Sequence, residues 1–186
     1  MSANHTIGAM NKLADALDNA GFDASDVTRL TQYSELALIL QLLNGHAQIV
    51  QLEHIIDCDA DPFTPNGWSF VEHCKNGKIQ WDAEKISSYL SEKQRSGGIV
   101  GNELRKELEK KSRLNANVLD YLLANPHLIP EAWKGKWIFF WGTIYRYSDG
   151  NLYVRCLFWV GGRWRWGDGW LADDFGADDP AALLAS

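Results

Sequence analysis

The sequence predicts an α+β protein, with helical N-terminal and central segments packed on a C-terminal antiparallel meander sheet and a small hairpin near 69–81. Residues 137–171 hold six of the nine tryptophans and alternate aromatic with β-branched residues, as half-buried strands do. The preceding segments carry apolar residues at helical spacing between capping and glycine signals. Hydrophobic residues make up 46% of the 186-residue chain and charged residues 23%, which is typical of soluble globular proteins.

Three short helices are predicted in residues 1–46, the helical N-terminal segment. Apolar spacing favours a helix over 7–19, a second one capped near Asp23 or Ser25, and a third from Ser34 to Leu43. The rest of the chain, 47–186, is predicted to be an α+β domain. We expect the two parts to form one compact unit overall.

The first part of the α+β domain is predicted to be a loop followed by a hairpin. Residues 57–67 are dense in Asp, Pro, Asn and Gly, which exclude regular structure. The apolar stretches WSFVEHC and KIQW flank Asn76 and Gly77, and Asn-Gly suits the two positive φ angles of a type I′ turn. The sequence therefore predicts that these two stretches pair with each other.

Helices are predicted to follow the hairpin. Asp82 is expected to cap a helix that ends at Gly97, and a second helix is expected over 102–110. Asn115 is predicted to cap a third helix, which stops before Pro126. After these helices we expect three antiparallel strands and then an acidic tail of small residues.

Charge and cysteine content limit the class of partner and the compartment. The net charge of −6 argues against duplex nucleic acid, because phosphate binding depends on Lys and Arg. The basic residues between 105 and 113 alternate with glutamates, as on a solvated helix face. Three widely spaced cysteines and the lack of a signal-peptide pattern predict a cytoplasmic protein. The longest apolar run, 36–43, is too short to span a bilayer, so no membrane partner is expected.

Several segments of the chain are similar to segments of other proteins. They include IDCDADPF, GNELRKEL, NANVLDYLLANPHLIPEAWKGK, FFWGTIYR and DPAALLAS, within about residues 49–186. Together they are similar to segments in the same order in a group of uncharacterised bacterial proteins. The resemblance implies a bacterial origin and brings no activity, cofactor or catalytic residue with it.

An acidic loop offers one candidate cation site. Asp57, Asp59 and Asp61 have the spacing that opens an EF-hand loop. Pro62 stands where that loop needs glycine, and Trp68 where it needs a bidentate glutamate. We therefore favour a turn in which the aspartates accept hydrogen bonds from nearby backbone amides, and expect no metal.

Imidazole and thiol groups offer a second candidate site. His54, Cys58, His73 and Cys74 are of the types that bind zinc, but adjacent residues in a strand point to opposite faces. The same alternation places Cys74 and His73 on opposite faces, so they are not expected to act together as nucleophile and base. Cys156 is expected to be an inert core thiol. No phosphate-binding glycine loop or other cofactor signature is present, so no cofactor is expected.

The third predicted strand and its neighbour carry a dense set of Trp and Arg side chains. Rings and guanidinium planes give a large contact area at low entropic cost, which suits a binding surface, although core packing under helices explains many such rings. The candidate contact residues are Arg155, Trp159, Arg163, Trp164, Arg165, Trp166, Asp168 and Trp170.

These patterns predict a cytoplasmic binding or interaction module that contacts a protein or small ligand through the Trp/Arg-rich sheet edge. The alternative is an enzyme that uses the acids of 57–61 or Asp168 together with His54 or His73. The residues specify neither the partner nor the oligomeric state. Function is expected near the turn and edge at 161–170, because both faces of the strand over 137–146 are apolar.

Overall fold

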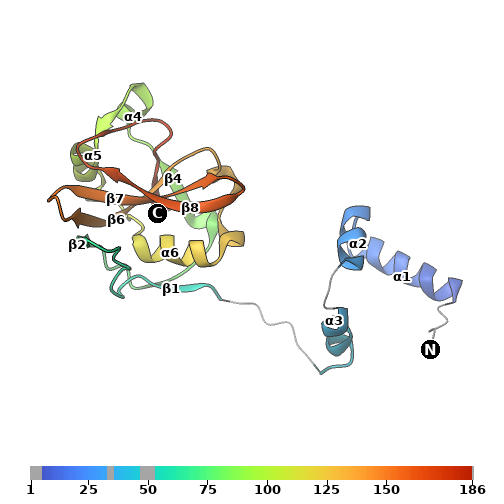
Figure 1. Ribbon diagram of the computed structural model, residues 1–186. Coiled ribbons are helices and arrows are strands. Elements are labelled where there is room, and N and C mark those ends of the chain that lie inside the picture. Colours follow the sequence, from blue (N-terminus) through green and yellow to red (C-terminus); the bar gives the residue numbers. More distant parts are fainter. Residues whose placement is uncertain (1–5, 33–35, 47–52, 186) are drawn as a thin grey trace. The chain divides into compact units, whose positions relative to one another are not determined.

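The computed structural model describes residues 6–32, 36–46 and 53–185 (Figure 1). The chain divides into two compact units, Met1–Leu52 and Glu53–Ser186. The second unit contains every strand of the described residues.

The first unit is helical. Its helices are α1 (Ile7–Asn19), α2 (Ala24–Thr31) and α3 (Leu36–Leu43). The Thr6 side chain accepts a hydrogen bond from the Ala9 amide at 3.2 Å, and Asp23 forms a reciprocal capping box with Asp26, which fixes where α1 and α2 begin. The helix predicted over 7–19 is confirmed, whereas the predicted cap at Ser34 lies outside the described residues.

The second unit is an α+β domain with a C-terminal meander, as predicted, and its sheet has six strands. The long strands β6 (Ile138–Tyr147), β7 (Leu152–Val160) and β8 (Arg163–Trp170) form the antiparallel meander. The strand order is β4-β10-β6-β7-β8, and β2 pairs with the second half of β6. The shorter strands are β1 (Ile55–Asp57), β2 (Trp68–His73), β3 (Lys78–Gln80), β4 (Ile86–Tyr89), β5 (Ile99–Val100), β9 (Asp174–Phe175) and β10 (Ala181–Leu184).

Helices cover both faces of this sheet. They are α4 (Glu92–Ser96), α5 (Gly101–Leu108) and α6 (Ala116–Ala124), with 3₁₀ turns at Ala83–Lys85, Pro126–Leu128 and Glu131–Trp133. Helix α6 lies along one face (Figure 1), where Leu119 and Leu122 pack with Phe140 and Leu157. Helix α5 contributes Leu104 and Leu108 to a second core with Trp141. The sheet is therefore an interior layer with hydrophobic residues buried on both sides.

A bulge in β6 brings the α6 layer close to the sheet. The pairing between β6 and β7 shifts between Phe139 and Ile144. Within this shift the Gly142 amide donates to the Leu114 carbonyl at 2.8 Å, and a Cβ at Gly142 would stand 2.8 Å from the same oxygen. Glycine is required at this position because the backbone that leads into α6 leaves no room for a side chain.

The predicted hairpin near 69–81 is wrong. Both stretches are strands, but β2 pairs with β6 and β3 pairs with β1. Gly77 has a positive φ of 69° and Asn76 does not, so the pair cannot form the type I′ turn that the prediction required. The Asn76 side-chain amide instead donates to the Arg113 carbonyl at 2.9 Å, and long-range pairing replaces the local hairpin.

The helix predicted from Asp82 to Gly97 is also wrong. Asp82 caps only the short 3₁₀ turn, and the chain continues as strand β4 before Ser91 begins α4 with a capping box. Strand β4 forms because β10 pairs with it in antiparallel register. The predicted acidic tail thus contains β10, which lies between β4 and β6 in the sheet. Strand β10 pairs with β6 in parallel, with Ala181 opposite Phe139. The helix capped by Asn115 is confirmed.

We predict that Gly142→Ala lowers the free energy of unfolding of the second unit by about 2 kcal/mol, because overpacking forces the backbone at Leu114 to move. Urea denaturation followed by tryptophan fluorescence measures the change.

The matched control is Gly176→Ala, whose added Cβ would meet only the Asp179 carboxylate, at 3.8 Å. We expect this control to keep the stability of the parent chain. Equal stability of the two variants would contradict the close approach at Gly142.

Candidate functional site

The hairpin formed by β7 and β8 carries most of the residues that the sequence singled out. Gly161 and Gly162 have φ angles of 58° and 75° and form the two-residue turn between the strands. The register then runs without a break from Val160↔Arg163 to Tyr153↔Trp170. A bulge-free pairing of this length makes β8 a regular strand at one end of the sheet.

Alternation along β8 sorts its side chains onto two faces. Trp164 belongs to the core beneath α6, so Trp166, Asp168 and Trp170 lie on that same face. Arg163 and Arg165 lie on the opposite face, together with two glycines. The aromatic and the basic side chains of this strand are therefore separated by the sheet.

The eight candidate residues differ in exposure. Arg155 is 1% exposed and Trp164 9%, so both belong to the interior, and Trp159 is half-buried. Trp166 and Trp170 are each 38% exposed. The exposed members, which we call the β8 edge surface, are Arg163, Arg165, Trp166, Asp168 and Trp170.

The buried Arg155 supports this surface from below. Its guanidinium donates two hydrogen bonds to the Asp120 carboxylate, at 3.0 and 2.7 Å, and lies 4.6 Å from the centre of the Trp166 ring. The Phe63 ring lies 5.4 Å from the same guanidinium. Because Asp120 fixes Arg155 and Arg155 stacks on Trp166, the exposed indole is held in one orientation.

The charge of Arg155 is maintained by its partner. Burial disfavours the charged guanidinium, but the hydrogen bonds and charge of Asp120 outweigh burial and raise the pKa of Arg155. Burial also raises the pKa of the neighbouring Tyr145 hydroxyl, which donates to the Phe63 carbonyl at 3.0 Å. The sequence did not single out Asp120 as a functional residue. A single acid on an amphipathic helix does not indicate which residue, far away in the chain, it pairs with.

A shallow hollow of about 370 Å³ opens beside the first half of β8. It is lined by Leu123 of α6 and by Arg163, Trp164, Arg165 and Trp166. The Trp164 ring packs edge-on against Trp159 at 5.4 Å, and the Lys134 ammonium lies 4.2 Å from the centre of the Trp159 ring. The hollow is thus lined by two indole rings, two guanidinium groups and one leucine.

The charges of the β8 edge surface are not neutralised within the domain. Among the residues that the structure describes, neither Arg163 nor Arg165 forms an ion pair. Partial burial raises the pKa of the Asp168 carboxyl. The two arginines are therefore open to an acidic group from outside.

The residues of the enzyme alternative take part in structural hydrogen bonds. The His73 ring contacts the Thr143 hydroxyl at 2.8 Å and the Cys58 carbonyl at 3.1 Å, and Asn115 donates to that carbonyl at 2.8 Å. Since the carbonyl can only accept, we assign the His73 proton to Nε2. His54 bonds with the Tyr121 hydroxyl at 3.0 Å. These contacts hold the loop around Cys58 in place.

The aspartates of 57–61 behave as turn residues. Asp57 accepts from the Asp59 amide at 3.0 Å, and Asp59 accepts from the Gly77 amide at 2.8 Å, as the turn interpretation predicts. Within the described residues, no group of three or more His, Cys, Asp or Glu side chains is arranged to hold a metal ion.

The thiols of Cys58 and Cys156 are poor nucleophiles. Burial, together with Asp59 and Asp57, raises the pKa of Cys58 to about 11. Burial likewise raises the pKa of Cys156, which lies in the core on the α5 side of the sheet. Both thiols therefore stay protonated at neutral pH.

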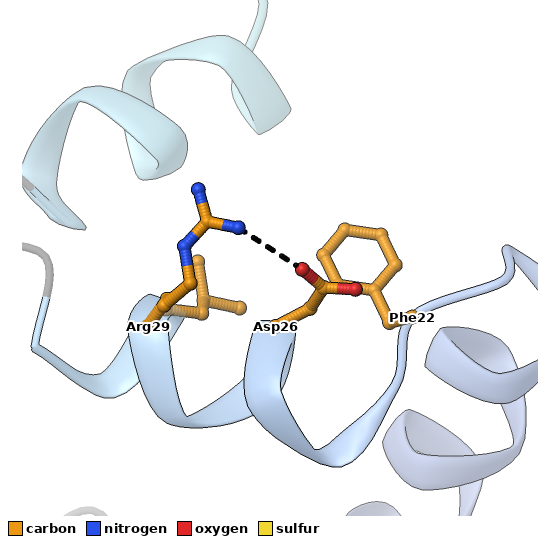
Figure 2. A pocket seen from close by; sticks show the side chains of 4 residues that line it. Phe22, Asp26 and Arg29 are labelled. Carbon is orange, nitrogen blue, oxygen red and sulfur yellow. Dashed lines mark hydrogen bonds and ion pairs between the residues drawn. The ribbon is translucent and has the colours of Figure 1, made fainter. Parts of the chain in front are cut away.

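Two further hollows are lined by residues outside β8. One belongs to the first unit and is lined by Phe22, Asp26, Arg29 and Leu30, with a volume of about 300 Å³. Figure 2 shows that its arginine turns toward Asp26, and the two form an exposed ion pair at 3.3 Å. The other has a volume of about 450 Å³ and is lined by Ser87 and by residues 110–112 and 183–185.

Comparisons with protein-family models, with curated proteins and with solved structures find no match to this chain. In the described part of the chain, no helix is long and apolar enough to cross a membrane. The geometry of the β8 edge surface is therefore the basis for the functional argument.

We predict that Asp120→Ala lowers the free energy of unfolding by about 3 kcal/mol, because it leaves the buried Arg155 charge without its carboxylate partner. Chemical denaturation at neutral pH measures the loss.

The matched control is Glu103→Ala, which removes an ion pair with Lys93 whose side chains are both 58% exposed. We expect this control to change stability by less than about 1 kcal/mol. Similar losses in the two variants would show that Arg155 does not depend on Asp120.

Proposed function

We propose that the second unit is a binding module that takes a protein or small ligand on the β8 edge surface. The observation that carries the proposal is Trp166, an exposed indole fixed over a buried guanidinium at the rim of a hollow. A surface ring that is held rigid loses little entropy when a partner covers it, and Trp and Arg dominate binding energy in such contacts.

Charge supports the same assignment. Arg163 and Arg165 flank the hollow and lack acidic partners among the described residues. An unpaired guanidinium can form bidentate hydrogen bonds with a carboxylate or phosphate group of a ligand. The net charge of −6 argues against duplex nucleic acid as this ligand.

The compartment is part of the proposal. Cys58, Cys74 and Cys156 are all free thiols, which fits a reducing environment. We therefore propose that the module acts in the cytoplasm, and the resemblance of its segments suggests a bacterial host. The hydrogen bonds of His73, His54 and the aspartates explain those residues without a catalytic role.

We predict that Trp166→Ala and Arg165→Glu each reduce the amount of partner retained by the immobilised chain by about tenfold or more, because each removes an anchor of the β8 edge surface. Capture from a bacterial cytoplasmic extract, quantified by mass spectrometry, measures the effect.

The matched control is Phe70→Ala, since Phe70 is 41% exposed on β2, which pairs with β6 on the side away from β7 and β8. We expect this variant to retain the partner. Unchanged capture by both β8 variants, with their folds intact, would overturn the proposed function.

A further inference from the structure

We infer that β8 receives its partner as an added strand, and that the partner is an extended peptide in which acidic residues alternate with apolar ones. The inference rests on the proposed function and specifies how the β8 edge surface binds. Its first support is the direction of the backbone groups of β8.

The outer edge of β8 presents backbone donors and acceptors. The Leu171 amide donates to the Leu152 carbonyl at 2.9 Å, which fixes the hydrogen-bonded positions of the β7–β8 pair. In an antiparallel pair these positions alternate, so Trp164, Trp166 and Asp168 occupy the other positions. Their N–H and C=O groups therefore point away from β7, toward the open side of the sheet.

The edge has few of the features that protect sheet edges. It is eight residues long, it has no bulge against β7, and it contains neither proline nor lysine. Among the described residues no strand pairs with its outer side. Two other strands of this sheet have an outer side that no strand pairs with in the described residues: β4 is only four residues long, and the six-residue β2 has an irregular register against β6. Strand β8 is thus the place where this sheet can extend by strand addition.

Side-chain alternation specifies the chemistry of the added strand. Neighbouring residues of a strand face opposite sides, so a peptide beside β8 meets Arg163 and Arg165 on one face and Trp164 and Trp166 on the other. Two acids spaced two residues apart would pair with the arginines. Apolar residues between them would enter the hollow that Trp164 and Trp166 line. The edge therefore selects an alternating acidic and apolar peptide.

A second copy of the chain fits this edge less well. Opposed residues of an antiparallel pair share a face, and the face of β8 with the arginines otherwise carries only Gly167 and Gly169. Two β8 strands side by side would place four arginines on one face with no carboxylate there, because Asp168 lies on the opposite face. Charged edges of this kind disfavour pairing with an identical edge.

The test uses a capped peptide, Ser-Val-Glu-Val-Glu-Val-Ser, and its counterpart with Lys in place of Glu. Calorimetry is expected to show about tenfold or stronger preference for the Glu peptide, and the double variant Arg163→Glu/Arg165→Glu is expected to reverse that preference. Hydrogen exchange by NMR is expected to slow by about tenfold or more at the Trp166 and Asp168 amides when the Glu peptide binds.

A backbone control separates strand addition from side-chain contact. Asp168→Pro removes an outward N–H that β7 does not use, whereas Asp168→Ala keeps it. Circular dichroism is the check that both variants keep the fold. We expect Asp168→Pro to bind the Glu peptide about tenfold more weakly than Asp168→Ala does, because the two variants lack the same carboxylate and differ in the outward N–H. Equal binding by the two variants overturns the inference.

Other results separate this inference from the proposed function. If neither peptide binds while Trp166→Ala still abolishes partner capture, strand addition is wrong and the binding surface stands. If the free chain sediments as a dimer with the Trp166 and Asp168 amides already protected, a second copy occupies the edge and the peptide assignment is overturned. If capture is also insensitive to Trp166, both proposals fail.

Discussion

Burial of both faces of β6 is the constraint on which the rest of the domain depends. Eight consecutive residues of this strand, Ile138–Tyr145, are buried, so each face needs its own covering layer. Helix α6 supplies one layer, and α5 supplies the other together with β9. Because both faces of β6 are used for packing, the centre of the sheet has no open face. The contact surface that we propose lies at the edge strand β8, where Trp166 and Trp170 are exposed.

The ion pair between Arg155 and Asp120 connects the core to that edge. Arg155 comes from β7 and Asp120 from α6, so the pair joins the sheet to its covering helix. Burial makes a charge costly unless a partner compensates for it, and here the compensated guanidinium also carries the Trp166 ring. Arg155, which the sequence suggested as a contact residue, is buried and instead holds Trp166, the proposed binding residue, in place.

The sequence predicts those parts of the fold whose signals are local. The meander strands follow from aromatic alternation and the Gly161-Gly162 turn, and the helix after Asn115 follows from its cap. Long-range pairing explains what was missed. Strand β10 was not predicted, because it consists of four small or apolar residues whose partners lie far away in the chain. The hairpin was predicted wrongly, because Gly77 has a positive φ and Asn76 does not. The candidate residues of β8 were found by composition, but their separation into buried and exposed members depended on α6.

Amide hydrogen exchange of the free chain tests the central claim most directly, namely that β8 is a paired strand with an open outer side. The account predicts alternation along β8: the Arg165, Gly167 and Gly169 amides, which face β7, exchange slowly, and the Trp166 and Asp168 amides exchange fast. Uniformly slow exchange along β8 in the monomer would mean that its outer side is already covered, and would contradict the account.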